Sequence, residues 1–360
     1  MLSNFDLGII VDPLIEWFKE NKRVLPWREN PTPYRVWVSE IMLQQTRVEA
    51  VKPFFERFIV ALPDIASLAE CDEKVLLKLW EGLGYYNRVR NMQTAAQSVM
   101  EQYDGILPAD YGELLKLKGI GSYTAGAIAS IAYHIPVPAV DGNVLRVISR
   151  VCADDSDIMK QSVKSAVEQS LLHSMPKTCA NLFNQALMEL GAMVCVPNGV
   201  PLCETCPLKF FCEAQIQNIQ MQFPVKSKAK ARRIEERTVF VIREGDKIVL
   251  NKRPKKGLLA GLYEFPNIEG HLTEKEALEW IKAQNLQPMR IQPLKASKHI
   301  FSHIEWHMIG YVVRVDELAK DDAGLLFVDV NESETNYPIP AVFLAYTKYM
   351  NIRLGNERFL

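Results

Sequence analysis

The stretch LKGIGSYTA, residues 117–125, places two glycines one residue apart directly before a segment that favours helix. Glycine permits a tight turn, and the first backbone N–H groups of the following helix point outward with a positive partial charge. Such a turn can hold one phosphate group without reading a base sequence, although an ordinary corner between two packed helices has the same pattern. We therefore expect two helices joined by a tight turn, with Gly119 and Gly121 as candidate contacts to a DNA phosphate.

A second loop follows at PVPAVDGN, residues 136–143, and its Asp141 lies twenty residues after Gly121. Its two prolines stiffen the chain, and Asp141 stands directly before Gly142 and a new apolar helical segment, residues 144–151. An aspartate at this position is typical of a plain helix N-cap. Because it follows a Gly-x-Gly turn in the same helical half, we also consider it a candidate functional carboxylate.

Four of the seven cysteines lie within eighteen residues, with gaps of seven, two and five residues between them. They are Cys195, Cys203, Cys206 and Cys212. Four thiolates on one short loop suit a [4Fe-4S] cluster or a structural zinc ion. Zinc sites usually pair two short knuckles, and only Cys203 and Cys206 form one, so the spacing favours iron–sulfur. Unliganded thiols or disulfides are the remaining alternatives.

Composition limits the class of protein. A chain of 360 residues is long enough for two domains, and a net charge of −1 means that any nucleic-acid binding must come from a local patch. The start of the chain lacks a signal-peptide pattern, and no apolar run approaches the roughly eighteen residues that span a bilayer. We expect a cytoplasmic protein of a reducing compartment, associated with the nucleoid if bacterial, without membrane contact.

The sequence pattern changes near residue 224. Residues 1–224 have helical spacing and include the cysteine loop 195–212, whereas residues 237–360 show alternating strand patterns and two helical segments, which predicts an α+β domain. Strands are expected at 238–242 and 248–250, with another at 304–308, and helices at 274–285 and 341–350. Between them, 225–236 is a basic segment that we interpret as a solvated linker, with contact to a phosphate backbone as the alternative.

Several longer motifs appear in a fixed order along the chain. They are LPWR (25–28), TPYRVWVSEIMLQQT (32–46), WEGLGYY (80–86), VDGN (140–143), GLLAGLYEFP (257–266) and FSH (301–303). Together with the Gly-x-Gly turn and the cysteine loop, they resemble the adenine DNA glycosylase (MutY) family of the endonuclease III superfamily, over nearly the whole chain. The resemblance implies an all-α helix-hairpin-helix glycosylase domain with a [4Fe-4S] loop, followed by an α+β Nudix-like domain.

The resemblance assigns catalytic roles to two carboxylates. Glu40 lies among apolar residues, which would raise its pKa and keep it protonated, although a surface glutamate on an amphipathic helix fits the same pattern. By resemblance Glu40 protonates the adenine base, while Asp141 stays ionised and stabilises the oxocarbenium-like sugar or attaches to it transiently, as in glycoside hydrolysis. Asn143 would orient the water or the carboxylate.

Tyr123 distinguishes two branches of the superfamily. Bifunctional members carry a lysine at this position, whose amine forms a Schiff base that leads to strand cleavage. Tyrosine cannot do this, so the resemblance implies a monofunctional enzyme that leaves an abasic site. Two rivals stay open: an endonuclease III-like enzyme for oxidised pyrimidines, and a non-catalytic module that binds damaged DNA.

The remaining expectations concern double-stranded DNA that contains adenine opposite 8-oxoguanine or guanine. An adenine in a duplex must be flipped out of the stack, and by resemblance Gln45 and Tyr85 fill the gap. The same resemblance places Arg28, Thr46 and Leu83 around the opposing base, gives Ser302 and His303 the reading of 8-oxoguanine, and predicts a monomer on DNA.

Three further features of the sequence concern metal sites. Cys195 and Cys203 are separated by seven residues, where the family usually has six. The second domain lacks the acidic metal-binding helix of catalytic Nudix enzymes, so pyrophosphate hydrolysis is not expected. His299, His303 and His307 are spaced by four and share one face of a strand, which leaves a metal site there as an alternative.

Overall fold

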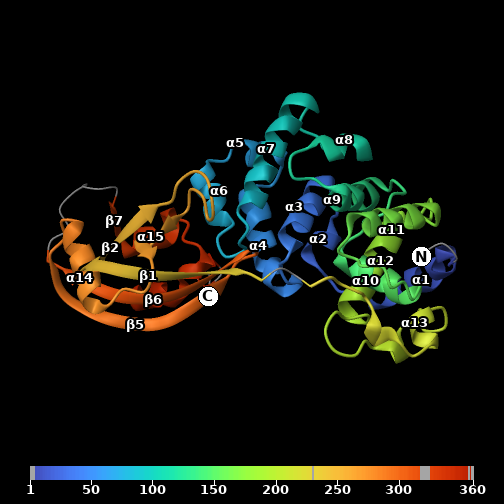
Figure 1. Ribbon diagram of the computed structural model, residues 1–360. Coiled ribbons are helices and arrows are strands. Elements are labelled where there is room, and N and C mark those ends of the chain that lie inside the picture. The colour runs from blue at the N-terminus through green and yellow to red at the C-terminus, as the bar shows by residue number, and fades with distance from the viewer. Residues whose placement is uncertain (1–4, 229–230, 317–324, 356, 358–360) are drawn as a thin grey trace. The chain divides into compact units, whose positions relative to one another are not determined.

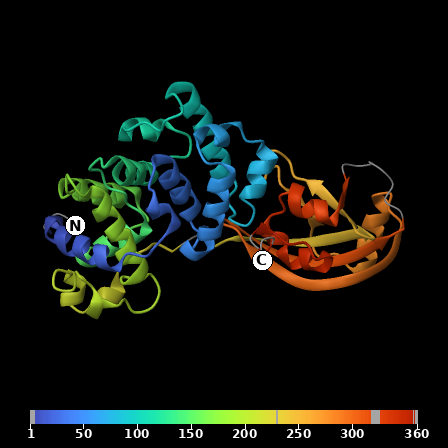
Figure 2. The same ribbon diagram turned by 180° about the vertical axis from the view of Figure 1, so that it is seen from behind.

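The computed structural model describes residues 5–228, 231–316, 325–355 and 357. The chain divides into two compact units, Met1–Glu70 with Asn91–Ala229, and Cys71–Arg90 with Lys230–Leu360. Figures 1 and 2 show the helices of the first unit and the sheet of the second from two sides. The segment Cys71–Arg90 therefore packs with residues that lie far later in the sequence. Among the described residues, no helix is both long and apolar enough to cross a membrane.

The first unit is helical. Its helices are α1 (Val11–Asn21), α2 (Pro26–Glu29), α3 (Pro33–Leu43), α4 (Val48–Ala61), α5 (Ile65–Glu70), α7 (Asn87–Gln102), α8 (Tyr111–Lys116), α9 (Ser122–Ala127), α10 (Gly142–Val151), α11 (Gln161–His173), α12 (Ala180–Met193) and α13 (Glu213–Ile216). A π-helical turn, η3 (Ile128–Ala132), extends α9, and α7 begins in the second unit before it continues here from Asn91. The helical half that the sequence predicts is confirmed.

Local signals explain where the functional helices start. Thr32 caps α3 by accepting a hydrogen bond from the backbone N–H of Arg35, and Pro33 occupies the first turn, where its missing N–H is not needed. Gly119 has a φ of +80° in the turn between α8 and α9, and Gly121 is the N-cap of α9. This turn is the helical hairpin that residues 117–125 predict.

One core of the first unit lies between α1, α10 and α12. The apolar faces of these helices meet at fully buried side chains, among them Phe18, Ile148 and Phe183. The start of α10 and the middle of α12 are thereby fixed relative to each other. Both helices also contribute side chains to the site described below.

The second unit contains, in its described part, a seven-stranded mixed sheet in the order β3-β2-β1-β6-β5, with β4 paired to β1 and β7 paired to β2. The strands are β1 (Arg233–Glu244), β2 (Lys247–Lys252), β3 (Tyr263–Glu264), β4 (Asn267–Glu269), β5 (Pro288–Ile300), β6 (Ile304–Val315) and β7 (Leu325–Asp329). β1 and β6 are parallel, and the other pairs are antiparallel. The helices are α6 (Glu73–Leu79), α14 (Glu274–Ala283), α15 (Val330–Asn336) and α16 (Leu344–Thr347).

Alternate residues of β1 face two separate cores. Val239 and Val241 pack on the side that carries Phe343 and Tyr346, whereas Phe240 and Ile242 pack on the side of α14. This period of two is what the sequence pattern predicts for a strand buried on both faces. The unit is therefore α+β, as expected.

Some predicted boundaries differ in detail. β1 begins at Arg233, so the last four residues of the predicted linker 225–236 are strand, while Ala229 and Lys230 lie outside the described residues. The predicted helix at 341–350 is divided into η6 (Ala341–Phe343), α16 and η7 (Lys348–Met350). The domain limits 1–224 and 237–360 stay a prediction.

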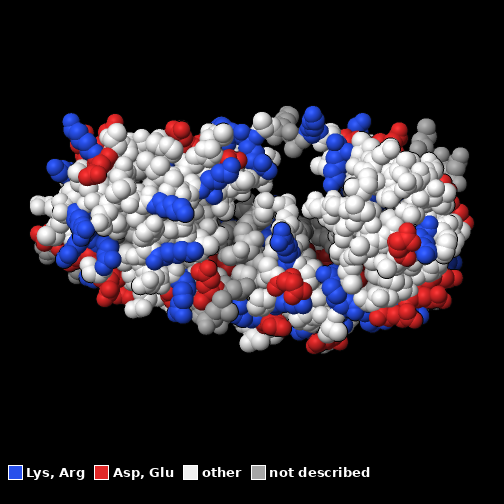
Figure 3. Space-filling model, turned by 90° about the horizontal axis from the view of Figure 1, so that it is seen from below, with Lys and Arg blue, Asp and Glu red and all other residues white. Residues whose placement is uncertain are grey.

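The face that Figure 3 shows carries charged side chains of both signs. Lysine and arginine side chains are interspersed with aspartate and glutamate on both units, and neither sign covers a whole unit. This agrees with the net charge of −1. Affinity for a polyanion must come from local arrangements of side chains.

Candidate active site

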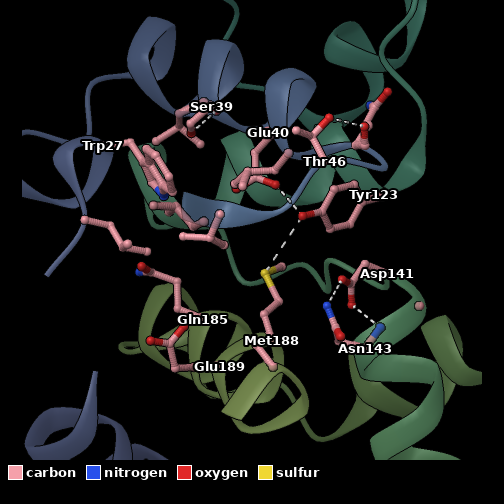
Figure 4. Close-up of a pocket in the computed structure, with 18 of the residues that line it drawn as sticks. Trp27, Ser39, Glu40, Thr46, Tyr123, Asp141, Asn143, Gln185, Met188 and Glu189 are labelled. Atoms are coloured by element: carbon pink, nitrogen blue, oxygen red, sulfur yellow. Dashed lines mark hydrogen bonds between the residues drawn. The ribbon is translucent and has the colours of Figure 1, made fainter. Parts of the chain in front are cut away.

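A pocket of about 600 Å³ opens in the first unit, and several predicted site residues line it. They are Arg28, Glu40, Gln45, Thr46, Tyr123, Asp141 and Asn143. These side chains come from four separate stretches of sequence, on or beside α2, α3, α9 and α10, and α12 closes the opposite wall (Figure 4). All four predicted catalytic residues therefore meet in one cavity.

Glu40 projects into this pocket from α3 and is only 6% exposed. Burial raises the pKa of its carboxyl to about 7, with a smaller contribution in the same direction from the charge of Asp141. A hydrogen bond from the Tyr123 hydroxyl to Oε2 of Glu40 acts in the opposite sense (Figure 4). Glu40 can therefore carry a proton near neutral pH, as the sequence predicts.

Tyr123 projects from α9 toward Glu40. Burial raises the pKa of its hydroxyl well above the ordinary value, so the hydroxyl is a hydrogen-bond donor at neutral pH. The Sδ atom of Met188 lies 4.0 Å from the same oxygen. The phenol thus fixes one oxygen of Glu40 and leaves the other free of this bond.

Asp141 has a different environment. Its Oδ1 accepts hydrogen bonds from the backbone N–H groups of Asn143 (2.9 Å) and Val144 (2.8 Å), and its Oδ2 accepts one from Nδ2 of Asn143 (2.7 Å). Burial raises the pKa of Asp141 above its ordinary value, and these bonds and the charge of Arg146 limit that rise. Asp141 is the N-cap of α10 and also lines the pocket, so the same residue can cap the helix and take part in the site.

The loop that leads to Asp141 is fixed by a buried amide. Oδ1 of Asn184 accepts from the N–H of Ala139 at 3.1 Å, and its Nδ2 donates to the carbonyl of Val137 at 2.9 Å and to the Ser130 hydroxyl at 2.8 Å. The loop also passes close to α9, since a Cβ at Gly126 would lie 2.1 Å from the Pro138 carbonyl oxygen. These contacts set the position of Asp141.

A buried ionic cluster forms another wall of the pocket. Glu189, on α12, accepts hydrogen bonds from Nε and Nη2 of Arg23 (2.9 and 2.8 Å) and from Nη1 and Nη2 of Arg28 (3.1 and 2.9 Å). Although burial opposes ionisation, these partners lower the pKa of Glu189 to about 2. Arg28 was predicted to lie near the opposing base, and here it is paired in the pocket wall.

Sequence reasoning missed four residues of this wall. They are Arg23, Gln185, Met188 and Glu189. One signal was available, because Glu189 is a charged residue on the largely apolar α12, and a buried carboxylate requires cationic partners. The partners themselves lie more than 160 residues away in sequence and could not be identified from spacing.

Gln45 and Thr46 lie at the end of α3 beside the pocket. Gln45 is exposed and has a φ of +59°, a left-handed conformation that is uncommon for a residue with a side chain. Such strain often marks a functional position. It is compatible with a side chain that reaches out of the protein, as the resemblance implies.

Four other predicted DNA contacts, Leu83, Tyr85, Ser302 and His303, belong to the second unit. Tyr85 is 48% exposed, and its hydroxyl lies 3.4 Å from the hydroxyl of Ser302, which is also exposed and precedes His303. Leu83 is buried. The structure thus brings Tyr85 and Ser302 together from positions 217 residues apart. The DNA contacts of all four residues stay predictions.

The four clustered cysteines line one small cavity of about 30 Å³. Arg150 donates from Nη1 to Sγ of Cys195 at 3.2 Å, and Sγ of Cys212 donates to the Arg150 carbonyl oxygen at 3.3 Å. Burial raises the pKa of the Cys206 and Cys212 thiols to about 12 and 11. Within the described ranges, however, no three His, Cys, Asp or Glu side chains are arranged as ligands of a metal ion. This includes the predicted alternative at His299, His303 and His307.

Comparison with known proteins gives a family match in the helical part of the chain and another in the part that forms the sheet. Residues 38–172 match the HhH-GPD superfamily of base excision DNA repair proteins, and residues 238–349 match the NUDIX domain. The chain is similar to the adenine DNA glycosylase of Buchnera aphidicola subsp. Acyrthosiphon pisum, with 32% identity over 85% of this chain and 87% of the relative. It is also similar to the adenine DNA glycosylase of Mus musculus, with 34% identity over 84% of this chain and 70% of the relative.

Solved structures give the same fold for the first unit. A thermostable thymine-DNA glycosylase has 25% identity and a TM-score of 0.52, covering 58% of this chain and 96% of its own. An endonuclease III solved in a non-covalent complex with DNA has 25% identity and a TM-score of 0.50, covering 59% of this chain and 96% of its own. The helix-hairpin-helix and Nudix-like fold classes predicted from sequence are confirmed.

Proposed function

Because this chain belongs to the adenine DNA glycosylase family, we propose that it is a base excision repair enzyme that hydrolyses the N-glycosidic bond of adenine in double-stranded DNA. The finer part of the proposal is that the adenine lies opposite 8-oxoguanine or guanine, and that the product is an abasic site. The observation that carries the mechanism is that Glu40 and Asp141 line one pocket. Glu40 accepts one hydrogen bond, from Tyr123, whereas Asp141 accepts three, from Asn143 and Val144.

Glu40 is the proposed general acid. With a pKa of about 7, its carboxyl is substantially protonated under physiological conditions and can donate a proton to a ring nitrogen of adenine. Protonation converts the base into a neutral leaving group as the glycosidic bond breaks. Tyr123 holds one oxygen of Glu40 by a hydrogen bond, which directs the other oxygen to the substrate.

Asp141 is the proposed partner of the sugar. Its three hydrogen bonds from Asn143 and Val144 favour the ionised form, and the negative charge stabilises the oxocarbenium-like sugar as adenine departs. Asn143 holds the carboxylate through Nδ2 and can also orient a water molecule. Water then adds to the sugar carbon and yields the abasic site.

An adenine in duplex DNA can enter this pocket only after it leaves the base stack. Flipping costs a few kcal/mol, which contacts in the pocket and in the vacated stack must offset. We assign the pocket contacts to the wall that carries Gln185 and Glu189 (Figure 4). Gln45 and Tyr85 are proposed to fill the vacated position, and Gly119 and Gly121 to contact a phosphate from the hairpin turn.

Tyr123 supports a monofunctional enzyme. A bifunctional lyase needs an amine that forms a Schiff base with the sugar, and a phenol that donates to Glu40 cannot supply it. This disfavours an endonuclease III-like activity on oxidised pyrimidines. The other rival, a non-catalytic binding module, is disfavoured because the pKa of the buried Glu40 is raised to about 7 beside a second carboxylate, an arrangement typical of catalytic acid–base pairs.

The second unit is the proposed reader of the opposing base. Tyr85, Ser302 and His303 belong to this unit, and the contact between Tyr85 and Ser302 supports a shared role. We propose that residues 1–224 catalyse, 225–236 connect, and 237–360 recognise 8-oxoguanine, with Leu83 and Thr46 near the opposing base. The enzyme would act as a monomer on DNA in the cytoplasm, at the nucleoid in a bacterium.

The cysteine loop is the proposed site of a [4Fe-4S] cluster. All four cysteines line one cavity, and thiolates are the ligands that such clusters require. The four residues therefore fit a cluster, although the described side chains are not arranged as ligands of a metal ion. Such a cluster would hold the loop in place. Iron near four per chain with a brown absorbance is the expected result, and stoichiometric zinc would contradict it.

The decisive experiment is single-turnover excision on three duplexes, analysed with and without alkali. They contain adenine opposite 8-oxoguanine, adenine opposite guanine, and thymine glycol opposite adenine. We expect adenine release from the first two, with strand breaks only after alkali. Strand cleavage of the thymine glycol duplex without alkali would place the chain among the bifunctional lyases.

A further inference from the structure

Glu81 is a fully buried carboxylate outside the pocket of Glu40. Its side chain has 0% exposure, and it belongs to the segment Cys71–Arg90 of the second unit. Nζ of Lys78, one turn earlier and also buried, donates to Oε1 of Glu81 at 2.8 Å. The same ammonium donates to the carbonyl oxygens of Tyr337 (3.0 Å) and Ser333 (3.3 Å). A buried ion pair is retained only when its remaining hydrogen-bonding capacity is satisfied, as it is here.

The two oxygens of Glu81 also bind the backbone of two distant segments. Oε1 accepts from the N–H of Ile339 at 2.8 Å, and Oε2 accepts from the N–H of Gly355 at 3.0 Å. Gly355 has a φ of +54°, and a Cβ there would lie 2.7 Å from the carbonyl oxygen of Glu81. One carboxylate therefore attaches an early segment of the chain to two segments near its C-terminal end.

The residues directly after Glu81 form a constrained loop. Gly82 and Gly84 have φ values of 101° and 69°, and Tyr85 has 47°, which is strained for a residue with a side chain. Nε1 of Trp80 donates to the Gly84 carbonyl at 3.0 Å, and Nη2 of Arg88 donates to the Leu83 and Gly84 carbonyls at 3.1 and 3.2 Å. The loop leaves the Glu81 anchor and ends at the exposed Tyr85.

We propose that Glu81 is a positioning residue for the recognition of the base opposite adenine. It fixes the loop that presents Tyr85 beside Ser302, so that both side chains meet the opposing base from the same unit. This inference rests on the proposed function, because it assumes that Tyr85 and Ser302 contact DNA. In this proposal Glu81 acts through Tyr85 and does not itself contact the substrate.

The first test is Glu81→Gln, which keeps the shape but replaces one accepting oxygen with a donor that faces a backbone N–H. Single-turnover rates are measured on duplexes with adenine opposite 8-oxoguanine and opposite guanine, after active-site titration. We expect the preference for 8-oxoguanine to fall on the order of tenfold, while the rate opposite guanine changes little. Glu332→Gln, an exposed carboxylate of α15 in the same unit, is the matched control and should retain the preference.

A double-mutant cycle separates positioning from general damage. If Glu81 acts through Tyr85, then adding Glu81→Gln to Tyr85→Ala should change the preference no further. If instead the two effects multiply, or if both rates fall by the same factor, the inference is overturned. Should Glu81→Gln not fold, Lys78→Met with Glu81→Met removes both charges together and should show the same loss of preference.

The outcomes also distinguish this inference from the function on which it rests. A wild-type protein that releases no adenine contradicts the proposed activity. Release at equal rates from both duplexes contradicts recognition of 8-oxoguanine, and the inference with it. A wild-type preference that persists in Glu81→Gln overturns the role of Glu81 alone.

Discussion

Arg146 donates a hydrogen bond from Nη2 to Oδ1 of Asn143 over 2.8 Å, and through Asn143 it is connected to Oδ2 of Asp141. The same guanidinium donates from Nε to the carbonyl oxygen of Cys195 at 2.8 Å and from Nη2 to that of Gly191 at 2.7 Å. A continuous chain of hydrogen bonds therefore joins the cysteine loop to the proposed catalytic aspartate.

Arg146→Lys should lower the excision rate more than DNA affinity. A lysine cannot reproduce the planar fork that reaches Asn143 and the Cys195 carbonyl together, so Asp141 loses its fixed orientation. We expect a decrease on the order of 10- to 100-fold in the single-turnover rate, with the Kd for DNA nearly unchanged. Arg314→Lys, at an exposed position of β6, is the control. Equal losses of rate and affinity would contradict a positioning role.

Glu40→Gln should abolish adenine release and spare much of the DNA binding. Glutamine has the same shape but no acidic proton to transfer, so a general acid worth about 10²- to 10⁴-fold is lost. The measurement is single-turnover excision opposite 8-oxoguanine, beside a binding titration with the same duplex. Glu49→Gln, on the exposed face of α4, serves as the control. Near-normal turnover in Glu40→Gln would remove Glu40 from the acid role.

The excision rate should decrease as the pH rises through about 7, because the acid form of Glu40 is the active one. The hydrogen bond from Tyr123 lowers the pKa of Glu40, so Tyr123→Phe should raise that pKa further and shift the descending limb to higher pH. Rates between pH 5 and 9 for both proteins test this. A limb that stays in place, or moves to lower pH, would show that Glu40 does not control it.

Much of the site follows from local sequence signals. Thr32 and Pro33 predict the start of α3, and Asp141 is the N-cap that its position indicates. The apolar neighbours of Glu40 predict its raised pKa, and the structure agrees. The resemblance to known motifs then predicts that Glu40, Tyr123 and Asp141 meet, which spacing alone cannot.

Other features could not be predicted, because they depend on pairs that only the fold brings together. Glu189 and Arg23 are 166 residues apart, and no local pattern matches a buried carboxylate to its cations. The attachment of Cys71–Arg90 to the second unit includes hydrogen bonds from the backbone N–H groups of Ile339 and Gly355 to Glu81. Backbone donors of this kind have no sequence signature.

Glu189→Gln should destabilise the first unit strongly. It leaves Arg23 and Arg28 without a counter-charge in a wall where Glu189 has a side-chain exposure of 1%, and breaking a buried ion pair costs about 3–5 kcal/mol. Because the folded pKa, about 2, lies below the ordinary 4.5, this stabilisation is complete above about pH 4.5 and is lost as the pH falls toward 2.

Urea unfolding at several pH values tests that prediction. The difference in free energy of unfolding between wild type and Glu189→Gln should be constant near neutrality and shrink below pH 4.5. Glu49→Gln, whose partner Lys52 is a surface residue on the same helix, should change the free energy of unfolding by less than about 0.5 kcal/mol. A difference that grows on acidification would contradict the assignment of charge to Glu189.

Gly126→Ala should displace the loop that carries Asp141. The added Cβ would lie 2.1 Å from the Pro138 carbonyl oxygen, so α9 and the loop must separate, at a cost of about 1–3 kcal/mol. Because this loop leads directly to Asp141, the excision rate should fall as well as the stability. Gly121→Ala has no heavy atom within 4 Å of its Cβ and is the control for stability. If both variants unfold at the wild-type urea concentration, contact between α9 and the loop does not set the position of Asp141.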